Sequence, residues 1–314
     1  MTGPAPFRVA VDGGELAGGQ WHADAAGMPL VGIHGITANL LSWAVVADAL
    51  PGVRLVAPDL RGRGRSGELP GPYGMAGHAD DVARMLDGLG IERAVVAGHS
   101  MGGFVAVWLA ERHPDRVERL VLIDGGLPVT RTADLGPARD RLRMTFASPQ
   151  DYLAFWHRHP ALGPWWNDAV ERYALYDLVG TAPELRSSVS EEAMAVNALE
   201  MDGGGGYAEA LAGLTLPIAF VRVPRGLLDT DPLYLPEEVA EWRARLPWFE
   251  AYEADDVNHY TIVMTQDGVR QLSPHLPGAY PPHPPHHSAP HRPLPAGPPP
   301  APSPLRPPLP LHPT

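Results

Sequence analysis

Ser100 is the residue whose surroundings most clearly suggest chemistry, because it lies between a buried strand pattern and a buried helix pattern. It belongs to the stretch VVAGHSMGG at residues 95–103, and the apolar run FVAVWLA follows at once. Gly98, Ser100 and Gly102 match the pattern G-x-S-x-G, in which a sharp turn between a strand and a helix presents the serine hydroxyl. The N-terminus of that helix favours an anion, since its N–H groups are free. We therefore predict that Ser100 is a nucleophile.

A serine nucleophile needs a base and an acid that orients this base. His259, in DDVNHYTIV, is the predicted base because it lies on a loop after the last expected strand. For the acid we expect Asp229, which follows the penultimate expected strand in VRVPRGLLDTDPLYLP. Asp124 is the alternative acid because it ends LVLIDGG, the strand that follows the Ser100 helix, and Asp231 is a weaker one.

The stretch GIHGITAN at residues 32–39 is predicted to form an oxyanion hole. Gly35 allows the loop to approach the serine closely. The backbone N–H of Ile36 and the N–H of Met101 can then donate to a negative oxygen. We expect His34 to shape this loop rather than to carry a proton.

The surrounding pattern predicts an α/β fold with a mostly parallel central sheet flanked by helices. Four apolar runs are nearly continuous, as in strands covered on both faces, and helical patterns alternate with them. Strands are expected at 29–35, 53–59, 93–100, 117–125, 216–223 and 248–255. Helices are expected at 39–50, 76–90, 101–112 and 236–246, and an antiparallel hairpin at 7–21.

The alternation of strands and helices stops after Leu127, and only helical, aromatic-rich patterns follow until about residue 213. We expect an α/β core at 1–126 and 214–276, with a helical cap inserted at 127–213. Trp156, Trp165 and Trp166 of this cap are expected to bind substrate, although their helical spacing also fits the interior of the cap. Residues 277–314 are expected to be a disordered tail, because 281–314 contain 16 prolines and 5 histidines.

The composition excludes several classes of protein. There is no cysteine, which excludes disulfides and thiolate metal sites. The formal net charge of −12 argues against nucleic acid or an anionic membrane as a partner. The N-terminal stretch lacks a basic region followed by an apolar one, and the uncharged window at 25–47 is broken by glycines and proline. We expect a cytoplasmic protein without a signal peptide or a membrane span.

Four segments in this order, HGI, APDLRGRGRS, GHSMGG and VNHY, resemble α/β-hydrolase-fold serine hydrolases with a helical cap. The resemblance covers roughly residues 5–272. It implies Ser100 as the nucleophile, His259 as the base, and the N–H groups of Ile36 and Met101 as the oxyanion hole.

The same resemblance assigns a supporting role to the segment DLRGRGRS, so Asp59 and Arg61 are expected to be structural. Epoxide hydrolases and haloalkane dehalogenases of this fold have an aspartate at the position of Ser100. Serine instead points to acyl transfer.

These observations predict a serine hydrolase that cleaves a small apolar or aromatic carboxylic ester through an acyl-enzyme, with no metal or organic cofactor. Hydrolysis of a lactone, a thioester or a carbon–carbon bond by the same residues is the alternative. A non-hydrolytic binding protein and a cofactor-free oxygenase of the same fold are further alternatives.

Overall fold

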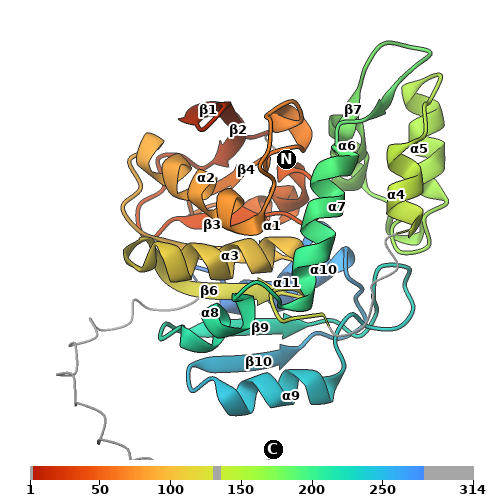
Figure 1. The fold of residues 1–314 in the computed structure, drawn as a ribbon. Coiled ribbons are helices and arrows are strands. Elements are labelled where there is room, and N and C mark those ends of the chain that lie inside the picture. The colour runs from red at the N-terminus through yellow and green to blue at the C-terminus, as the bar shows by residue number, and fades with distance from the viewer. Residues whose placement is uncertain (1–2, 130–135, 279–314) are drawn as a thin grey trace, which may run out of the picture. The chain divides into compact units, whose positions relative to one another are not determined.

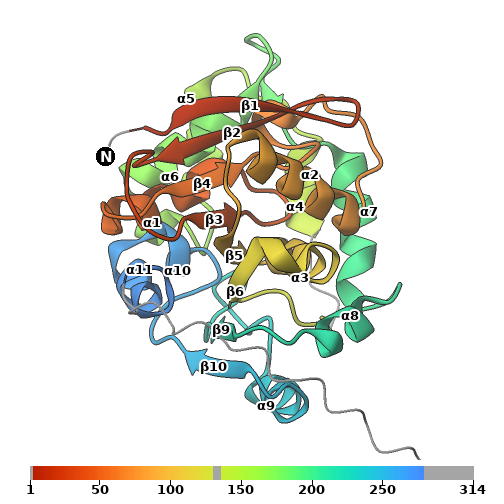
Figure 2. The same ribbon diagram turned by 90° about the vertical axis from the view of Figure 1, so that its left-hand side faces the viewer.

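A computed structural model describes residues 3–129 and 136–278, and within them eight strands form one central sheet. The order across the sheet is β1-β2-β4-β3-β5-β6-β9-β10 (Figure 2). The bounds are Ala5–Val11 for β1, Gly14–Trp21 for β2, Leu30–Ile33 for β3, Leu55–Pro58 for β4, Ala94–His99 for β5, Val117–Ile123 for β6, Ile218–Arg222 for β9 and Phe249–Glu253 for β10. Strands β1 and β2 form an antiparallel hairpin and β2 also pairs antiparallel with β4, whereas β4, β3, β5, β6, β9 and β10 are mutually parallel. The predicted hairpin and parallel sheet are confirmed.

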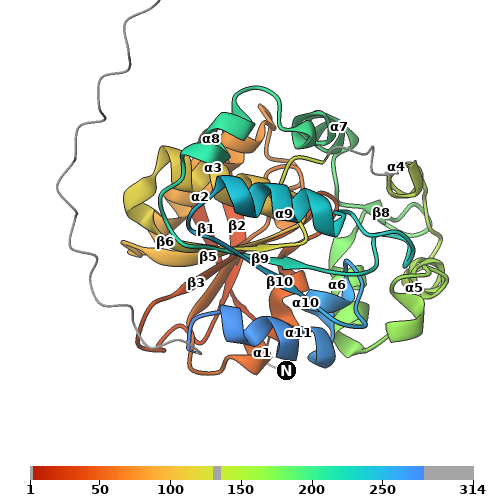
Figure 3. The same ribbon diagram turned by 90° about the horizontal axis from the view of Figure 1, so that it is seen from below.

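Helices cover both faces of this sheet (Figures 2 and 3). One face carries α2 at Met75–Gly88, α3 at Met101–Arg112, α8 at Tyr207–Gly213 and α9 at Pro236–Arg245. The other face carries α1 at Ala44–Ala49, α10 at Thr261–Met264 and α11 at Gln266–Leu272. The last two helices, α10 and α11, are separated at Thr265.

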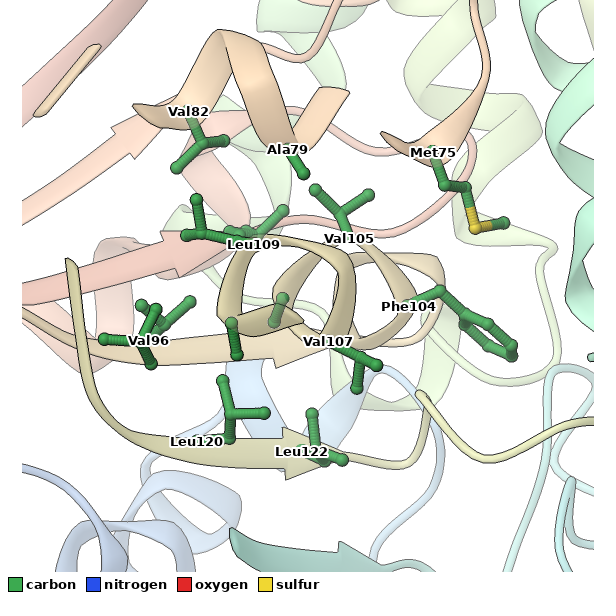
Figure 4. Close-up of a cluster of buried hydrophobic side chains, with 14 of the residues drawn as sticks. Met75, Ala79, Val82, Val96, Phe104, Val105, Val107, Leu109, Leu120 and Leu122 are labelled. Atoms are coloured by element: carbon green, nitrogen blue, oxygen red, sulfur yellow. The ribbon is translucent and has the colours of Figure 1, made fainter. Parts of the chain in front are cut away.

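Helix α3 lies in the centre of the larger apolar core, which fixes the position of its N-terminal end. Its residue Val105 lies toward Ala79 of α2, while Val107 lies toward Leu122 of β6 (Figure 4). All four are fully buried. Burial of each large aliphatic side chain contributes about 1.5–3 kcal/mol to folding. This packing holds the turn at Ser100 rigidly between β5 and α3.

Four helices of the inserted segment lie together at one end of the sheet (Figure 1). They are α4 at Gly136–Leu142, α5 at Pro149–His157, α6 at Asp168–Asp177 and α7 at Glu191–Leu199. The cap was expected to be purely helical, but it also contains an antiparallel pair, β7 at Leu178–Val179 and β8 at Arg186–Ser187. Gly180, at φ +98°, begins the turn between these two strands, in a conformation that glycine adopts without strain.

Helix α8, which was expected in the cap, packs against the core. The ring of Tyr207 lies 4.9 Å from that of Phe104 in α3, and its hydroxyl donates to the carbonyl oxygen of Gly126 at 2.6 Å. We therefore place the end of the cap before α8 rather than at residue 213.

Within the described residues, no helix has the length and apolarity needed to cross a bilayer. From residue 279 onward, the expected proline-rich tail lies outside the described part of the chain.

Candidate active site

Ser100 lies in a strained turn between β5 and α3, as the sequence pattern predicts. Its backbone has φ 56° and ψ −127°, a conformation that residues other than glycine rarely adopt. A Cβ on Gly98 would lie 2.3 Å from the carbonyl oxygen of Gly102, and a Cβ on Gly102 would lie 2.1 Å from that of Ile33. Glycine is therefore required on both sides of Ser100, because α3 approaches both β5 and β3 too closely for a side chain at these positions.

His259 is paired with Asp124. The Nδ1 atom of His259 lies 2.6 Å from Oδ2 of Asp124, and both side chains are almost completely buried. Since a carboxylate accepts, Nδ1 carries the proton in this pair and Nε2 is the nitrogen left to act as a base. Ser100 and His259 line one cavity.

The expectation that Asp229 orients His259 is wrong. Asp229 instead pairs with Nε of Arg225 at 3.1 Å and accepts from Nδ2 of Asn258 at 2.9 Å. The reason is the position of each aspartate after its strand. Asp124 follows β6 directly, next to the strand of Ser100, whereas several loop residues separate Asp229 from the end of β9.

The weaker alternative, Asp231, is exposed. Gly125, the residue after Asp124, lets the loop after β6 approach the serine turn closely. A Cβ on Gly125 would lie 2.0 Å from the carbonyl oxygen of Ser100. Asp124 itself has φ 42°. The loop after β6 therefore packs directly on the serine turn.

The loop after β3 lies beside Ser100. A Cβ built on Gly35 would lie 3.2 Å from Cβ and 3.6 Å from Oγ of Ser100. Among the described residues, no hydrogen bond uses the N–H of Ile36 or of Met101. Both residues are buried, and Ile36 lines the cavity beside Ser100. These two N–H groups remain the candidate donors to an oxyanion.

His34 shapes this loop, as expected. Its Nδ1 donates to the carbonyl oxygen of Gly35 at 2.8 Å, and its Nε2 accepts from the N–H of Leu60 at 3.0 Å. Burial lowers the pKa of His34 to about 3. The imidazole is therefore neutral near pH 7 and serves to join two loops.

His99 supports the backbone at His259. Its Nε2 donates to the carbonyl oxygen of His259 at 2.7 Å, and the two rings lie 4.6 Å apart. Burial holds the pKa of His99 well below its usual range, and the neighbouring His259 adds to this effect. A neutral His99 avoids placing a positive charge against the imidazole of His259.

Asp59 and Arg61 support the fold, as the resemblance implies. The carboxylate of Asp59 accepts from the N–H groups of Leu40 at 2.9 Å and Arg65 at 2.8 Å, and burial raises its pKa to about 6. Arg61 pairs with Asp81 through two hydrogen bonds of 2.9 and 3.0 Å. Neither residue lines the cavity beside Ser100.

The cavity, of about 80 Å³, lies between the carboxyl ends of the strands and the cap. Trp156 lines it and so remains a candidate for contact with a substrate. Trp165 and Trp166 do not line it: Trp165 lines a separate surface groove, and Trp166 packs against His157 with ring centres 3.8 Å apart and ring planes tilted by 32°. The helical spacing of these tryptophans could not distinguish the cavity side from the outside of the cap.

Several cavity residues had no role in the sequence analysis, among them Tyr260 and Arg141, which carry polar groups. Tyr260 follows the predicted base directly, and this adjacency was the signal that could have identified it. Arg141 lies in the stretch ARDRLRM with two other arginines, Arg139 and Arg143, and no feature of the pattern separates the buried one from its exposed neighbours.

No group of three or more histidines or carboxylates within the described residues could hold a metal ion.

Known proteins share this sequence pattern and fold. A model of the alpha/beta hydrolase fold family matches residues 28–217. Lipase LipV of Mycobacterium tuberculosis is 39% identical over 121 residues, 38% of this chain and 44% of the relative. The 2-hydroxymuconate semialdehyde hydrolase of a Pseudomonas species is 38% identical over 122 residues, 36% of this chain and 43% of the relative. The matched region spans less than half the length of these two relatives.

A solved structure gives the wider comparison. The structure of E-2-(acetamidomethylene)succinate hydrolase superposes with a TM-score of 0.74, covering 87% of this chain and 98% of that chain at 23% identity. At this identity the likeness concerns the fold alone.

Proposed function

Because the chain belongs to the α/β hydrolase fold family, we propose that it is a serine hydrolase that cleaves a carboxylic ester through an acyl-enzyme. The observation that carries the proposal is the 2.6 Å contact between His259 and Asp124, in a pair whose histidine shares a cavity with Ser100. A buried carboxylate that orients a histidine beside a strained serine is the arrangement that activates a hydroxyl for attack.

The proposed reaction begins when Oγ of Ser100 attacks the ester carbonyl and Nε2 of His259 takes the serine proton. Asp124 stabilises the imidazolium that forms, without taking the proton itself. The N–H groups of Ile36 and Met101 donate to the negative oxygen of the tetrahedral intermediate, and the loss of one such donor costs about 3–4 kcal/mol.

The tetrahedral intermediate then collapses, and His259 returns its proton to the departing alcohol. This leaves the acyl group on Ser100. A water molecule, deprotonated by the same imidazole, attacks the acyl-enzyme, and the imidazolium then returns that proton to Oγ of Ser100 as the acid departs. No group other than these side chains and backbone donors is needed for either half of the reaction.

Intact mass after exposure to a fluorophosphonate tests this proposal. We expect one covalent adduct per chain on the wild type and none on Ser100→Ala. Ser42→Ala is the matched control, because Ser42 lines the same cavity but its hydroxyl donates to the carbonyl oxygen of Asn39 at 2.9 Å. This variant should be labelled like the wild type. A folded wild type that stays unlabelled would rule out the serine hydrolase.

Hydrolysis of p-nitrophenyl esters provides the second readout. Wild type should release p-nitrophenol, and Ser100→Ala should lower kcat by about 10⁴- to 10⁶-fold. Labelling of Ser100 without any ester turnover would retain the activated serine but reject the ester as the bond that is cleaved.

A further inference from the structure

Arg141 places a guanidinium group in the wall of the catalytic cavity. It lies in α4 of the cap, its side chain is only 2% exposed, and it lines the cavity together with Ser100 and His259. A buried arginine needs a counter-charge, and Asp177 provides it, with Nη1 of Arg141 at 2.6 Å from Oδ2. Among the described residues that line this cavity, none is an aspartate or a glutamate.

Asp177 lies behind the arginine, away from the cavity lining. Its Oδ2 atom also accepts from the hydroxyls of Tyr152 at 2.5 Å and Ser187 at 2.8 Å, and its Oδ1 accepts from Ser188. These donors stabilise the carboxylate independently of the arginine. The pair therefore presents its positive end to the cavity and keeps its negative end within the cap.

The side of the guanidinium opposite Nη1 has unused donors. Nη2 makes only a long contact of 3.4 Å with the carbonyl oxygen of Thr37, and Nε makes no hydrogen bond with any described residue. Guanidinium has five N–H donors in a planar fork that matches a carboxylate. A ligand in the cavity that left these donors unpaired would bind less well than one that accepts from them.

Two tyrosines add further donors to the same cavity. Tyr173 and Tyr260 both line it, and their hydroxyls make no hydrogen bond within the described part of the chain. Burial raises the pKa of Tyr260 to about 12, and the charge of Arg141 opposes this rise. Burial and Arg141 together lower the pKa of His159, on the same wall, to about 4. The positive charge of Arg141 thus acts on several groups of the cavity lining.

We propose that Arg141, with Tyr173 and Tyr260, forms a carboxylate-binding subsite. The substrates are then small esters whose acyl part carries a free, ionised carboxylate in addition to the ester group that is cleaved. The inference rests on the proposed serine hydrolase and names its substrate class. The acyl part is the one that stays on Ser100 after the alcohol departs, so it remains in the cavity that Arg141 lines. This class replaces the apolar or aromatic ester that the sequence analysis favours.

The first experiment compares two p-nitrophenyl esters with the same acyl chain on the wild type. One is mono-p-nitrophenyl glutarate, and the other is its methyl ester, in which an uncharged ester group replaces the carboxylate and adds one methyl group. Spontaneous hydrolysis is subtracted with Ser100→Ala. We expect kcat/KM to be at least about 10-fold higher for the anionic ester, since a hydrogen-bonded charged pair gives a preference of about 10- to 100-fold. Equal values, or a preference for the methyl ester, would overturn the subsite.

Variants of Arg141 test whether this residue causes the preference for the anionic ester. Arg141→Gln combined with Asp177→Asn removes the pair without leaving a buried carboxylate unpaired, and it should lower kcat/KM for the anionic ester alone. Arg139→Gln is the matched control on the same helix, because Arg139 is exposed and pairs with Glu191 at 3.2 Å. It should keep the wild-type preference. A preference that survives in the double variant would place the recognition elsewhere and overturn the proposal.

A measurement on the wild type alone covers the case in which the double variant does not fold. Glutarate should slow the labelling of Ser100 by a fluorophosphonate, and glutaramide, which is uncharged and of similar size, should not. Equal effects of the two compounds on a protein that is labelled would overturn the subsite and leave the serine hydrolase standing. A protein that is not labelled at all would remove the proposed function, and the subsite with it.

Discussion

The carboxylate of Asp124 lies 2.6 Å from Nδ1 of His259, although 135 positions separate the two residues in the sequence. The contact forms because β6 lies next to β5 in the sheet and Asp124 follows β6 directly. Ser100 follows β5, Asp124 follows β6 and His259 lies on the loop after β10, so all three lie beyond the carboxyl ends of one sheet, where open α/β sheets bind their ligands.

This contact predicts different results for the two candidate acids. Asp124→Asn should lower kcat by about 10⁴-fold, because the amide removes the charge that stabilises the imidazolium and favours the wrong tautomer of His259. Asp229→Asn should retain most of the activity, since Asp229 contacts Arg225 and Asn258 rather than the imidazole. Steady-state rates on a p-nitrophenyl ester check both variants, with circular dichroism as a test of folding. A larger loss in Asp229→Asn would restore Asp229 as the acid.

Much of the fold could be predicted from the sequence because strands and helices differ in periodicity. The parallel strands are buried on both faces, so their apolar runs are nearly continuous, and the pattern around Ser100 specifies a turn that only glycines permit. The position of His259 in the chain order was enough to identify the histidine that pairs with an acid in this cavity.

The choice between Asp124 and Asp229 could not be made from the sequence, because both follow a strand of the same sheet. What separates them is the course of the loop after each strand, which depends on tertiary packing. Likewise, the three tryptophans of the cap share a helical pattern, but only Trp156 faces the cavity. Arg141 is buried, whereas Arg139 of the same helix and Arg143 just after it are exposed. This difference arises from tertiary contacts of Arg141, chiefly with Asp177, Tyr152 and Ser187.

The close approach of Gly35 to Ser100 predicts a loss of activity in Gly35→Ala. The added methyl group would lie 3.6 Å from Oγ and 3.2 Å from Cβ of Ser100, so the loop that carries the N–H of Ile36 must shift by a few tenths of an ångström. We expect kcat to fall by about 10- to 100-fold through misplacement of the oxyanion donor. Gly52→Ala is the control, because nothing lies within 4 Å of its Cβ. Equal kcat values for the Gly35 and Gly52 variants would contradict the prediction.

The buried Arg63 predicts that the cap and the oxyanion loop are coupled in stability. Its Nε donates to the carbonyl oxygen of Ile36 at 3.0 Å, and its Nη2 donates to Oδ1 of Asn197 in α7 at 2.8 Å. Burial lowers the pKa of Arg63 to about 9. Asn197→Ala leaves a donor of this buried cation unpaired and should reduce the free energy of unfolding by about 1–3 kcal/mol.

Urea unfolding measures the effect of Asn197→Ala, and Gln271→Ala is the matched control. Gln271 makes hydrogen bonds of 2.7 and 2.9 Å with the backbone of Asp255, but these are exposed to solvent. Gln271→Ala should therefore reduce the free energy of unfolding by about 0.5 kcal/mol or less. A similar loss in both variants would mean that the contact between Arg63 and Asn197 adds nothing beyond an ordinary surface hydrogen bond.

Buried histidines predict a loss of stability in acid. Burial lowers the pKa of His78 to about 3, and the charge of Arg63 adds to this effect. In the unfolded chain the histidine pKa is about 6.5, so as pH falls from 6.5 toward 3 the unfolded state binds a proton that the folded state does not, and stability decreases. Urea unfolding measures the free energy of unfolding at pH 6.5 and at pH 5. The decrease between these two values should be smaller in His78→Gln than in the wild type by about 2 kcal/mol.

Asp59 has the opposite effect on stability. Burial raises its pKa to about 6, so as pH falls the folded state binds a proton at Asp59 before the unfolded state does. Its contribution is the same in the wild type and in His78→Gln, so it cancels in their difference. His157→Gln is the control, since His157 is exposed, and it should keep the wild-type dependence on pH. If His78→Gln lost as much stability as the wild type between pH 6.5 and 5, the folded protein would have to accept a proton at His78. The packing of its imidazole against Arg63 and Asn197 would then have to open at pH 5.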